Sequence, residues 1–335
     1  MSGSLRIALF GAGRIGRVHA KNLARADGAE FAGIGDVDGE AAAKLAEETG
    51  AQRAGAVETF LDDPAVNAVL IATPTETHSA LVERAAAAGK HIFCEKPISL
   101  DLAATKSAIA AVRKSGVTLQ IGFQRRYDPR FVRARQAVES GDLGTLRFLR
   151  LVGRDRVPPS IDYVRTSGGQ YRDQMVHEFD AARWLSGEEV QEVTAVGSAL
   201  VDARIAEAGD VDTAVACLRF ESGALAVIDS AREAVYGYDS RLEILGSNGL
   251  FLDEDRLKSD TVMGVEFLTP DAESFATRFS DAYRLELQDF IESLRTSRLP
   301  RAGGDDALQA LRIAIAADHS RKARRTIPLA EIDVA

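Results

Sequence analysis

The sequence predicts an α/β protein of two domains, with a doubly wound parallel sheet in residues 1–123 and an α+β domain with a largely antiparallel, open sheet in residues 124–335. Two observations support this prediction. In the first segment, short apolar runs alternate with amphipathic helical patterns, which is typical of a parallel sheet covered by helices on both faces. In the second segment, consecutive hairpin signals replace that alternation. Hairpins build antiparallel sheets, which can leave one face open.

Length and composition agree with two packed domains. The chain has 335 residues, of which 46% are hydrophobic and 27% charged, as expected of globular cores rather than disorder. The net charge of −9 provides no polybasic surface, so we expect neither nucleic acid nor a membrane as a partner. The longest apolar runs, such as Ala68–Ala72, are too short to cross a bilayer.

The start of the chain and its cysteines indicate the compartment. A strand pattern begins at Leu5, which leaves no room for a signal peptide after Met1. Cys94 and Cys217 both stand in apolar, strand-like segments. One disulfide is possible, but we expect two buried, reduced thiols, which indicates a cytoplasmic protein.

The first domain is predicted to contain five strands, each a continuous apolar run as expected of a strand buried on both faces. These strands are Leu5–Phe10, Phe31–Gly35, Ala68–Ala72, His91–Cys94 and Thr118–Phe123. Helical patterns between them include Arg14–Ala26, Ser79–Gly89 and Leu102–Lys114.

The second domain begins with a predicted helix at Pro129–Ser140 and a strand at Leu146–Leu151. A proline-bearing loop then leads to a helix near Tyr171–Ser186. Hairpin turns are expected at Glu221–Gly223 and Ser247–Gly249. Two further predicted helices, at about Ala276–Thr296 and Asp305–Arg321, complete the chain.

A glycine-rich turn follows the first strand. Its residues, which we expect to bind a dinucleotide, are Gly11, Ala12, Gly13, Arg14, Ile15 and Gly16, and they fit the G-x-G-x-x-G pattern. The pattern alone is a weak signal, but here a strand precedes it and a helix follows it. The first glycine permits the tight turn, the second lets the backbone approach a pyrophosphate, and the third lets helix and strand pack closely. This context favours a Rossmann cofactor site over an ordinary strand–helix turn.

Asp36 stands 20 residues beyond Gly16, at the end of the second strand. A carboxylate at this place accepts hydrogen bonds from the adenosine ribose, and it would repel a 2′-phosphate. The segment Asp36–Gly39 has no Arg or Lys to offset that charge, so we expect NAD rather than NADP. The alternative is a solvated aspartate at a strand end.

Two further strand ends should meet the same crevice. Thr73 and Pro74 are expected to line the nicotinamide ribose, while Thr77 caps the next helix and His78 packs or caps rather than catalyses. Lys96, after the strand that ends at Cys94, could exchange a proton with a substrate hydroxyl. By position alone, a surface lysine is an equally good interpretation.

The segment from Asp173 to Asp180 makes a catalytic interpretation of Lys96 more favourable. On one continuous helix, Asp173, His177 and Asp180 would share a face, because positions three and four apart are neighbours. A carboxylate beside an imidazole fixes the tautomer of the ring and raises its basicity, as a general base requires. A structural histidine is the alternative. Trp184 continues the same stripe and is expected in the core.

Together, the glycine turn, the Glu95-Lys96-Pro97 tripeptide and the Asp173…His177…Asp180…Trp184 spacing resemble the glucose–fructose oxidoreductase/inositol dehydrogenase (Gfo/Idh/MocA) family over essentially the whole chain. Within that family the chain most resembles bacterial myo-inositol 2-dehydrogenases. The segments that carry this closer resemblance are residues 93–101, 122–129, 167–169 and 234–239.

The resemblance implies roles for individual residues. Lys96 would be the catalytic lysine, and Asp173 with His177 the proton-relay pair. Glu95, Lys96 and Gln124 would contact the cofactor, and the Lys96–Pro97 bond could be cis. Substrate hydroxyls would be bound by Lys96 and His177 and by four further residues, Arg126, Asp155, Asp180 and Tyr236. No metal is expected, and the family is commonly tetrameric through its open sheets.

The resulting expectation is an NAD-dependent dehydrogenase that oxidises a secondary hydroxyl of a cyclic polyol, giving a ketone such as an inosose. The loop Gly153–Ser160 departs from the inositol pattern at Arg156 and Val157. A dehydrogenase of another inositol isomer, an aldose or an anhydro-sugar is therefore an alternative. A non-catalytic NAD-binding sensor is a second one, although it would have no need of Lys96, Asp173 and His177 together.

Overall fold

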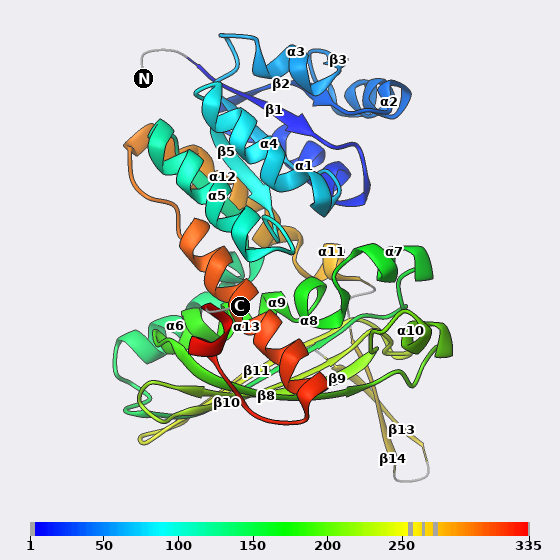
Figure 1. The fold of residues 1–335 in the computed structure, drawn as a ribbon, viewed down its shortest axis with the longest axis vertical. Coiled ribbons are helices and arrows are strands. Elements are labelled where there is room, and N and C mark those ends of the chain that lie inside the picture. Colours follow the sequence, from blue (N-terminus) through cyan, green and yellow to red (C-terminus); the bar gives the residue numbers. More distant parts are fainter. Residues whose placement is uncertain (1–3, 254–256, 263–264, 271–273, 334–335) are drawn as a thin grey trace. The chain divides into compact units, whose positions relative to one another are not determined.

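The computed structural model describes residues 4–253, 257–262, 265–270 and 274–333. The chain forms two compact units, unit 1 with the residues up to 127 and 281–308, and unit 2 with residues 128–280 and those from 309 onward (Figure 1). Each unit holds one large sheet, one parallel and one largely antiparallel, as the sequence predicts. The expected assignment of everything after residue 123 to the second domain differs from this division, because residues 281–308 return to unit 1.

Unit 1 contains six parallel strands in the order β3-β2-β1-β4-β5-β6. The strand order reverses between β1 and β4, and ligands of doubly wound sheets bind at such a point. The strands are β1 (Leu5–Phe10), β2 (Ala29–Gly35), β3 (Ala54–Gly55), β4 (Ala68–Ile71), β5 (His91–Glu95) and β6 (Leu119–Gly122). Its helices before residue 128 are α1 (Arg14–Leu23), α2 (Gly39–Thr49), α3 (Val57–Leu61), α4 (Thr75–Ala87), α5 (Leu102–Ser115) and the 3-10 helix η1 (Gln124–Tyr127).

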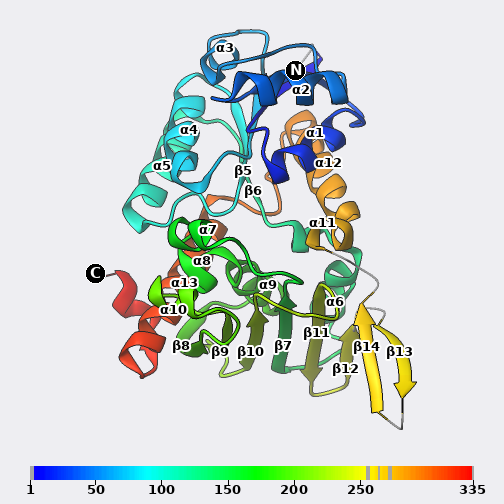
Figure 2. The same ribbon diagram turned by 90° about the vertical axis from the view of Figure 1, so that its right-hand side faces the viewer.

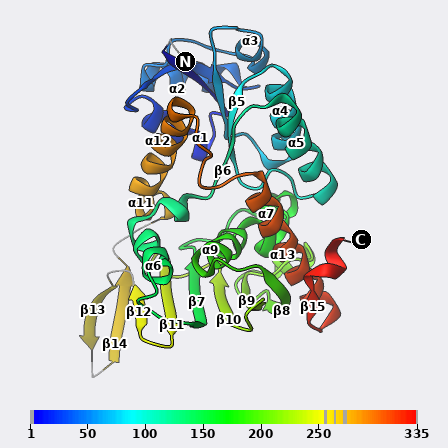
Figure 3. The same cartoon turned by 90° about the vertical axis from the view of Figure 1, so that its left-hand side faces the viewer.

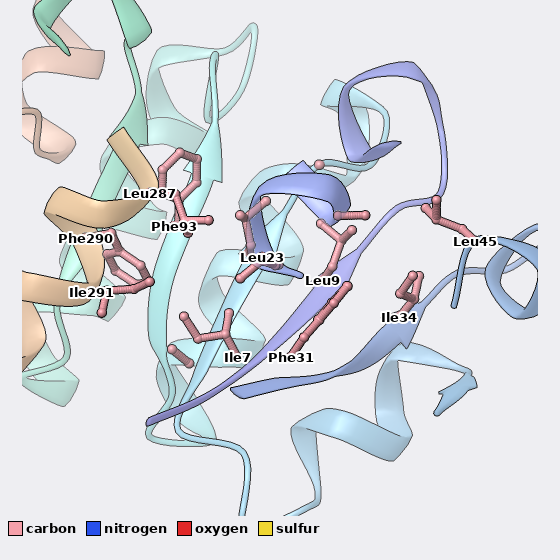
Figure 4. Close-up of a cluster of buried hydrophobic side chains, with 14 of the residues drawn as sticks. Ile7, Leu9, Leu23, Phe31, Ile34, Leu45, Phe93, Leu287, Phe290 and Ile291 are labelled. Carbon is pink, nitrogen blue, oxygen red and sulfur yellow. The ribbon is translucent and has the colours of Figure 1, made fainter. Parts of the chain in front are cut away.

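The helix α12 (Ser280–Thr296) explains why a late segment belongs to unit 1. It lies beside α1 in two views at right angles (Figure 1, Figure 2). Its apolar side chains Leu287, Phe290 and Ile291 join the core formed by Ile7, Leu9 and other residues of the parallel sheet (Figure 4). Burial of apolar surface is the main stabilising term in folding, so this core fixes α12 to the parallel sheet.

The large sheet of unit 2 contains seven strands in the order β12-β11-β7-β10-β9-β8-β15 (Figure 3). All its neighbouring pairs are antiparallel except β7 and β10. The strands are β7 (Leu146–Arg154), β8 (Val190–Ser198), β9 (Thr213–Phe220), β10 (Leu225–Ala231), β11 (Asp239–Gly246), β12 (Leu250–Asp253) and β15 (Ile327–Pro328), and a separate hairpin pairs β13 (Leu257–Val262) with β14 (Val265–Pro270).

The helices of unit 2 cover one face of its sheet (Figure 1). They are α6 (Pro129–Glu139), α7 (Ile161–Thr166), α8 (Gly169–Asp173), α9 (Val176–Ser186), α10 (Ala203–Glu207), α11 (Phe275–Arg278), α13 (Gly304–Ala323, which starts in unit 1) and the 3-10 helix η2 (Leu329–Asp333). No helix in the described ranges has the length and apolarity to span a membrane.

Residues on β9 alternate between buried and exposed, because its second face carries no helix of the described chain. Cys217 points to that open face and is exposed, whereas Cys94 is buried, and both are free thiols. The expectation of two reduced thiols is thus met, but the expected burial of Cys217 is wrong. An apolar neighbourhood in sequence does not tell which face of a half-covered strand a residue occupies.

The single helix predicted near Tyr171–Ser186 is also wrong, because the structure divides it into α8 and α9. The amide of Met175 bonds the carbonyl of Gln170, five residues back, and the amide of His177 bonds that of Gln174, three residues back. Gln174 holds this break in place, since its side-chain amide donates to the carbonyls of Gly153 (3.3 Å) and Ala231 (3.0 Å).

Candidate functional site

The carboxyl ends of five parallel strands of unit 1 lie at one edge of the sheet. The backbone register pairs Phe10 with both Gly35 and Ile71, Ile71 with Cys94, and Glu95 with Gly122. All the cofactor residues predicted from the sequence directly follow or end these strands. The topology of unit 1 therefore brings the predicted cofactor set to one edge, at the place where open α/β sheets bind ligands.

The three glycines of the turn differ in the space around them. A Cβ on Gly11, whose φ is +104°, would lie 2.4 Å from the carbonyl oxygen of Ala72, and one on Gly16 would lie 2.1 Å from that of Gly11. Neither position can therefore hold a larger residue without a backbone shift. Gly13 has no atom within 4 Å of its missing Cβ, so this position is open to a ligand.

The amino end of α1 suits an anion. Its N-cap residue is Gly13, which has no side chain that could cap the first amides. The first turn, which contains Arg14 and Ile15, holds no acidic residue. Uncapped N–H groups and the positive end of the helix dipole attract a phosphate. Together with the open space at Gly13, this arrangement fits a dinucleotide pyrophosphate.

Asp36 contacts the glycine turn directly. Its Oδ2 accepts a 2.6 Å hydrogen bond from the amide of Ala12, and its Oδ1 accepts one of 2.9 Å from the amide of Asp38. A carboxylate has about four lone-pair positions, so these two bonds leave acceptor capacity for a ribose diol. The sequence does not reveal this bond to the turn, which places the carboxylate close to the phosphate-binding backbone.

Thr73 and Pro74 form the turn between β4 and α4, as expected from the sequence. Thr77 is not the cap predicted for the next helix, because α4 already begins at Thr75 and has Pro74 at its N-cap position. The Thr77 hydroxyl lies 2.6 Å from that of Thr73 and donates to the Pro74 carbonyl at 2.8 Å. It therefore stabilises the turn from within the helix.

Glu95 and Lys96 stand at the end of β5, and the Lys96–Pro97 peptide bond is cis. Lys96 is half-buried. Glu95 is buried, and its Oε1 lies 2.6 Å from Nε2 of His19, a fully buried residue of α1. The predicted cofactor contact of Glu95 thus competes with a close internal partner. Sequence reasoning missed His19, although it lies on the buried side of α1 with Gly16, Ala20 and Leu23.

Two further predicted residues lie in or next to η1. Gln124 is buried, and its Oε1 has no hydrogen-bond partner within the described ranges, so it remains a candidate for a cofactor contact. Arg126 is 4% exposed and uses its guanidinium within unit 1, donating to the Arg301 carbonyl at 2.6 Å and pairing with Asp306 at 2.8 Å. These bonds explain Arg126 without a substrate, which the prediction did not foresee.

In unit 2, Asp173 ends α8 within a cluster of charged and polar groups. Its Oδ1 accepts a 2.9 Å hydrogen bond from the hydroxyl of Tyr163, and its Oδ2 lies 3.3 Å from Nη1 of Arg232. Arg232 is 1% exposed and also faces Asp210, with 3.5 Å between Nη2 and Oδ2. Because a buried cation is costly without opposite charges, Asp173 and Asp210 stabilise Arg232 as much as Arg232 orients Asp173.

His177 is half-buried and lies in the first turn of α9. The turn at Gln174 and Met175 separates α8 from α9, so Asp173 and His177 lie on two helices rather than on the single one expected, and their pairing stays a prediction. Asp180 lies farther along α9 and is fully buried. Its contact with a substrate hydroxyl stays a prediction.

The other two predicted substrate ligands keep some exposed surface. Asp155 is half-buried after β7 and its amide donates to the carbonyl of Ala231. The Tyr236 hydroxyl accepts from Nη1 of Arg154 and donates to Oδ2 of Asp239, both at 2.8 Å. Burial raises the pKa of Tyr236 above its usual value, so the phenol stays protonated and able to donate.

The residues that sequence reasoning missed share one property. Tyr163, Arg232 and His19 each contact a predicted site residue from another element, over sequence distances of 10, 59 and 76 residues. Arg232 had a local signal, because it is a charged residue directly after the alternating strand β10, and His19 had one in its place on the buried side of α1. Tyr163 gave no such signal.

Two family models match the chain. One, described as an oxidoreductase family with an NAD-binding Rossmann fold, covers residues 5–123, and the other, the GFO/IDH/MocA C-terminal domain, covers residues 131–252. The chain is 42% identical to the myo-inositol 2-dehydrogenase of Thermotoga maritima over 98% of its own length and 99% of that protein.

Solved structures agree with these matches. The crystal structure of a probable dehydrogenase from Thermotoga maritima superposes with a TM-score of 0.94 at 42% identity, covering 98% of this chain and all of that one. The scyllo-inositol dehydrogenase of Lactobacillus casei, solved with NAD(H) and scyllo-inositol, superposes with a TM-score of 0.90 at 26% identity, covering 98% and 100%.

Proposed function

The chain belongs to the Gfo/Idh/MocA oxidoreductase family, and we propose that it oxidises a secondary hydroxyl of a cyclic polyol with NAD, converting myo-inositol to 2-keto-myo-inositol. The observation that carries the proposal is the presence of Lys96, Asp173 and His177 in a chain 42% identical to a myo-inositol 2-dehydrogenase over nearly its full length. The region before residue 128, with 281–308, serves as the cofactor domain, and the rest of the chain serves as the substrate domain.

Each proposed catalytic residue has a separate role. His177 accepts the proton of the reacting hydroxyl, and Asp173 stabilises the imidazolium that results. Lys96 donates a hydrogen bond to the same oxygen and stabilises negative charge as it develops there. Arg232 and Tyr163 keep the Asp173 carboxylate in place, as supported by their contacts of 3.3 and 2.9 Å.

The cofactor would be held by the glycine turn, Asp36, Thr73, Pro74 and Gln124. Bound NAD would supply the hydride acceptor for the reaction. Asp36 supports NAD over NADP, because its carboxylate lies next to the turn that would hold the phosphates and would repel an additional phosphate on the ribose. Of the four additional predicted substrate ligands, Asp155 and Tyr236 keep exposed surface, and we retain these two as hydroxyl-binding residues.

A panel of cyclic polyols tests this proposal. With NAD and purified protein, the rate of NADH formation should give the highest kcat/KM on myo-inositol. Sites that hydrogen-bond several substrate hydroxyls discriminate strongly against analogues that lack them. A clear preference for a linear alcohol or a hydroxy acid would contradict the assignment, and no turnover of any polyol, aldose or anhydro-sugar would favour an NAD-binding sensor.

scyllo-Inositol is the second candidate substrate, because the similarity to the Lactobacillus casei scyllo-inositol dehydrogenase spans 98% of this chain. The two isomers differ in the orientation of the hydroxyl at one carbon. A higher kcat/KM on scyllo-inositol than on myo-inositol in the same panel would select this candidate.

We further propose a homotetramer of a cytoplasmic protein. The open face of the second sheet supports the homotetramer, because it exposes large apolar side chains, and an exposed apolar patch is typical of a protein–protein interface. These residues are Val196, Val215, Leu225, Leu245, Leu250 and Leu252. The two free thiols support a reducing compartment.

A further inference from the structure

His78 has a place in unit 1 that the proposed reaction does not yet use. It lies in the first turn of α4 and is 2% exposed. Its Nε2 lies 2.8 Å from the carbonyl oxygen of Thr73, in the turn that follows β4. Its Nδ1 lies 2.8 Å from the carbonyl oxygen of Pro97, directly after Lys96 and the end of β5. One imidazole therefore contacts both backbone turns at the cofactor edge.

The chemistry of these two contacts is unusual. A carbonyl oxygen can only accept a hydrogen bond, so each ring nitrogen must donate for both contacts to be attractive. A neutral imidazole has one N–H, and only the imidazolium has two. His78 therefore holds one turn when neutral and both turns when protonated.

The charged groups near the ring are Glu95 and Lys96, both at the end of β5. Burial lowers the pKa of His78, because a charged ring loses its hydration, and the positive charge of Lys96 acts in the same direction. The two carbonyl groups and the Glu95 carboxylate oppose this change. The hydrogen bonds to both carbonyl groups are therefore present only at a pH below the range in which a histidine usually titrates. At higher pH the ring keeps one of the two bonds.

We propose that His78 is a positioning residue that ties the turn at Thr73, which would line the nicotinamide ribose, to the turn that carries Lys96. β4 and β5 are already neighbours, with Ile71 paired to Cys94, but their ladder ends before either turn. His78 supplies the link between the turns themselves. This inference rests on the proposed function of Lys96 and Thr73, and it concerns how those two groups stay in register.

Two substitutions separate the two contacts. The amide nitrogen of Asn can occupy the place of Nδ1, and that of Gln the place of Nε2, so His78→Asn keeps the donor to Pro97 and His78→Gln keeps the donor to Thr73. At a pH below the titration of His78, where the wild-type ring donates both bonds, we expect His78→Gln to lower kcat about 10- to 100-fold, as a misplaced catalytic group does, with little change in the Kd for NADH. We expect His78→Asn to raise that Kd about 2- to 12-fold, the effect of one lost hydrogen bond, with a smaller loss of kcat.

His91→Gln is the matched control. His91 is a half-buried histidine at the opposite end of β5, where Nδ1 accepts a hydrogen bond from the amide of Thr118 at 3.1 Å. Its replacement should lower the Tm and leave kcat and the NADH Kd within about twofold of wild type, since it removes one ordinary hydrogen bond far from the turns. A purely structural His78 would behave in the same way as this control.

The readouts are NADH binding by fluorescence, steady-state rates on a polyol, and ¹⁵N NMR of the His78 ring. The spectrum should show protons on both nitrogens at acid pH and on one above the titration. At a pH below the titration of the ring, equal effects of the Asn and Gln variants, or wild-type behaviour of either one, would overturn the proposal. If the wild type turns over no polyol, the proposed function fails, whereas NADH binding and the ring spectrum still decide the role of His78.

Discussion

Replacement of Asp173 by Asn should affect folding stability as well as turnover. Asp173 is one of two carboxylates that face the buried Arg232 guanidinium, at 3.3 Å, while Asp210 faces it at 3.5 Å. The change keeps the size of the side chain and its bond from Tyr163 but removes one of the two negative charges. A catalytic role alone would leave the stability unchanged.

The magnitude follows from the burial of this cluster. Removal of one partner from a buried ion pair costs about 3–5 kcal/mol, because the remaining charge is left without compensation. Arg232 retains Asp210, so we expect the lower end of that range or less, about 2–3 kcal/mol of the free energy of unfolding. Arg232→Met, which removes the cation, should be destabilising by a similar amount because two carboxylates then face each other.

The double variant Asp173→Asn/Arg232→Met distinguishes structure from catalysis. Urea denaturation should show that it is more stable than the sum of the single effects predicts, with a coupling of about 1–3 kcal/mol, as contacting residues show. Its turnover should remain as low as that of Asp173→Asn. Strictly additive stabilities would refute the ion-pair reasoning, and recovered turnover in the double variant would mean that Asp173 acts only as a structural partner of Arg232.

Three further outcomes follow from the site and the open sheet. Asp36→Ser should weaken NAD binding by about 1–3 kcal/mol. It should also narrow the preference for NAD over NADP, measured as the ratio of the two kcat/KM values. A wild-type protein that uses NADP as well as NAD would contradict this role of Asp36. Lys96→Ala and His177→Ala should each lower kcat about 10²-fold or more, while NADH binding survives. The fold-loss of kcat in the double variant should be smaller than the product of the two single fold-losses. A wild-type rate in either single variant would remove that residue from the proton transfer. Val215→Glu should dissociate the proposed tetramer in sedimentation velocity and speed maleimide labelling of Cys217 on the same face, and an unchanged assembly would exclude the open face as the interface.

The fold of unit 1 could be predicted from sequence because its strands are continuous apolar runs. The predicted bounds of the first strand, Leu5–Phe10, are the observed ones, and those of the other four lie within two residues of the structure. The assignment of residues 281–296 to unit 1 could not be predicted. An amphipathic helix shows that it has an apolar face, but nothing in its own residues tells which core that face joins.

The candidate site was predictable to the extent that its residues follow strand ends. Gly11, Asp36, Thr73 and Lys96 each follow a parallel strand, so topology alone brings them to one edge. The break before His177 was not predictable, because it depends on bonds from the Gln174 side chain to the carbonyls of Gly153 and Ala231, which are distant in sequence. The ion pair of Asp173 with Arg232 depends in the same way on a strand 59 residues away.

The contacts that sequence could not supply have a common consequence at Lys96. On one side, His19 from α1 holds the Glu95 carboxylate at 2.6 Å, and α1 is the helix whose amino end would bind the pyrophosphate. On the other side, His78 from α4 contacts the Pro97 carbonyl and the turn that would line the nicotinamide ribose. The lysine thus stands between two residues that are each tied to a different part of the cofactor site. A long, flexible side chain can act on one oxygen atom only if its backbone is fixed, and these two buried histidines provide that fixation.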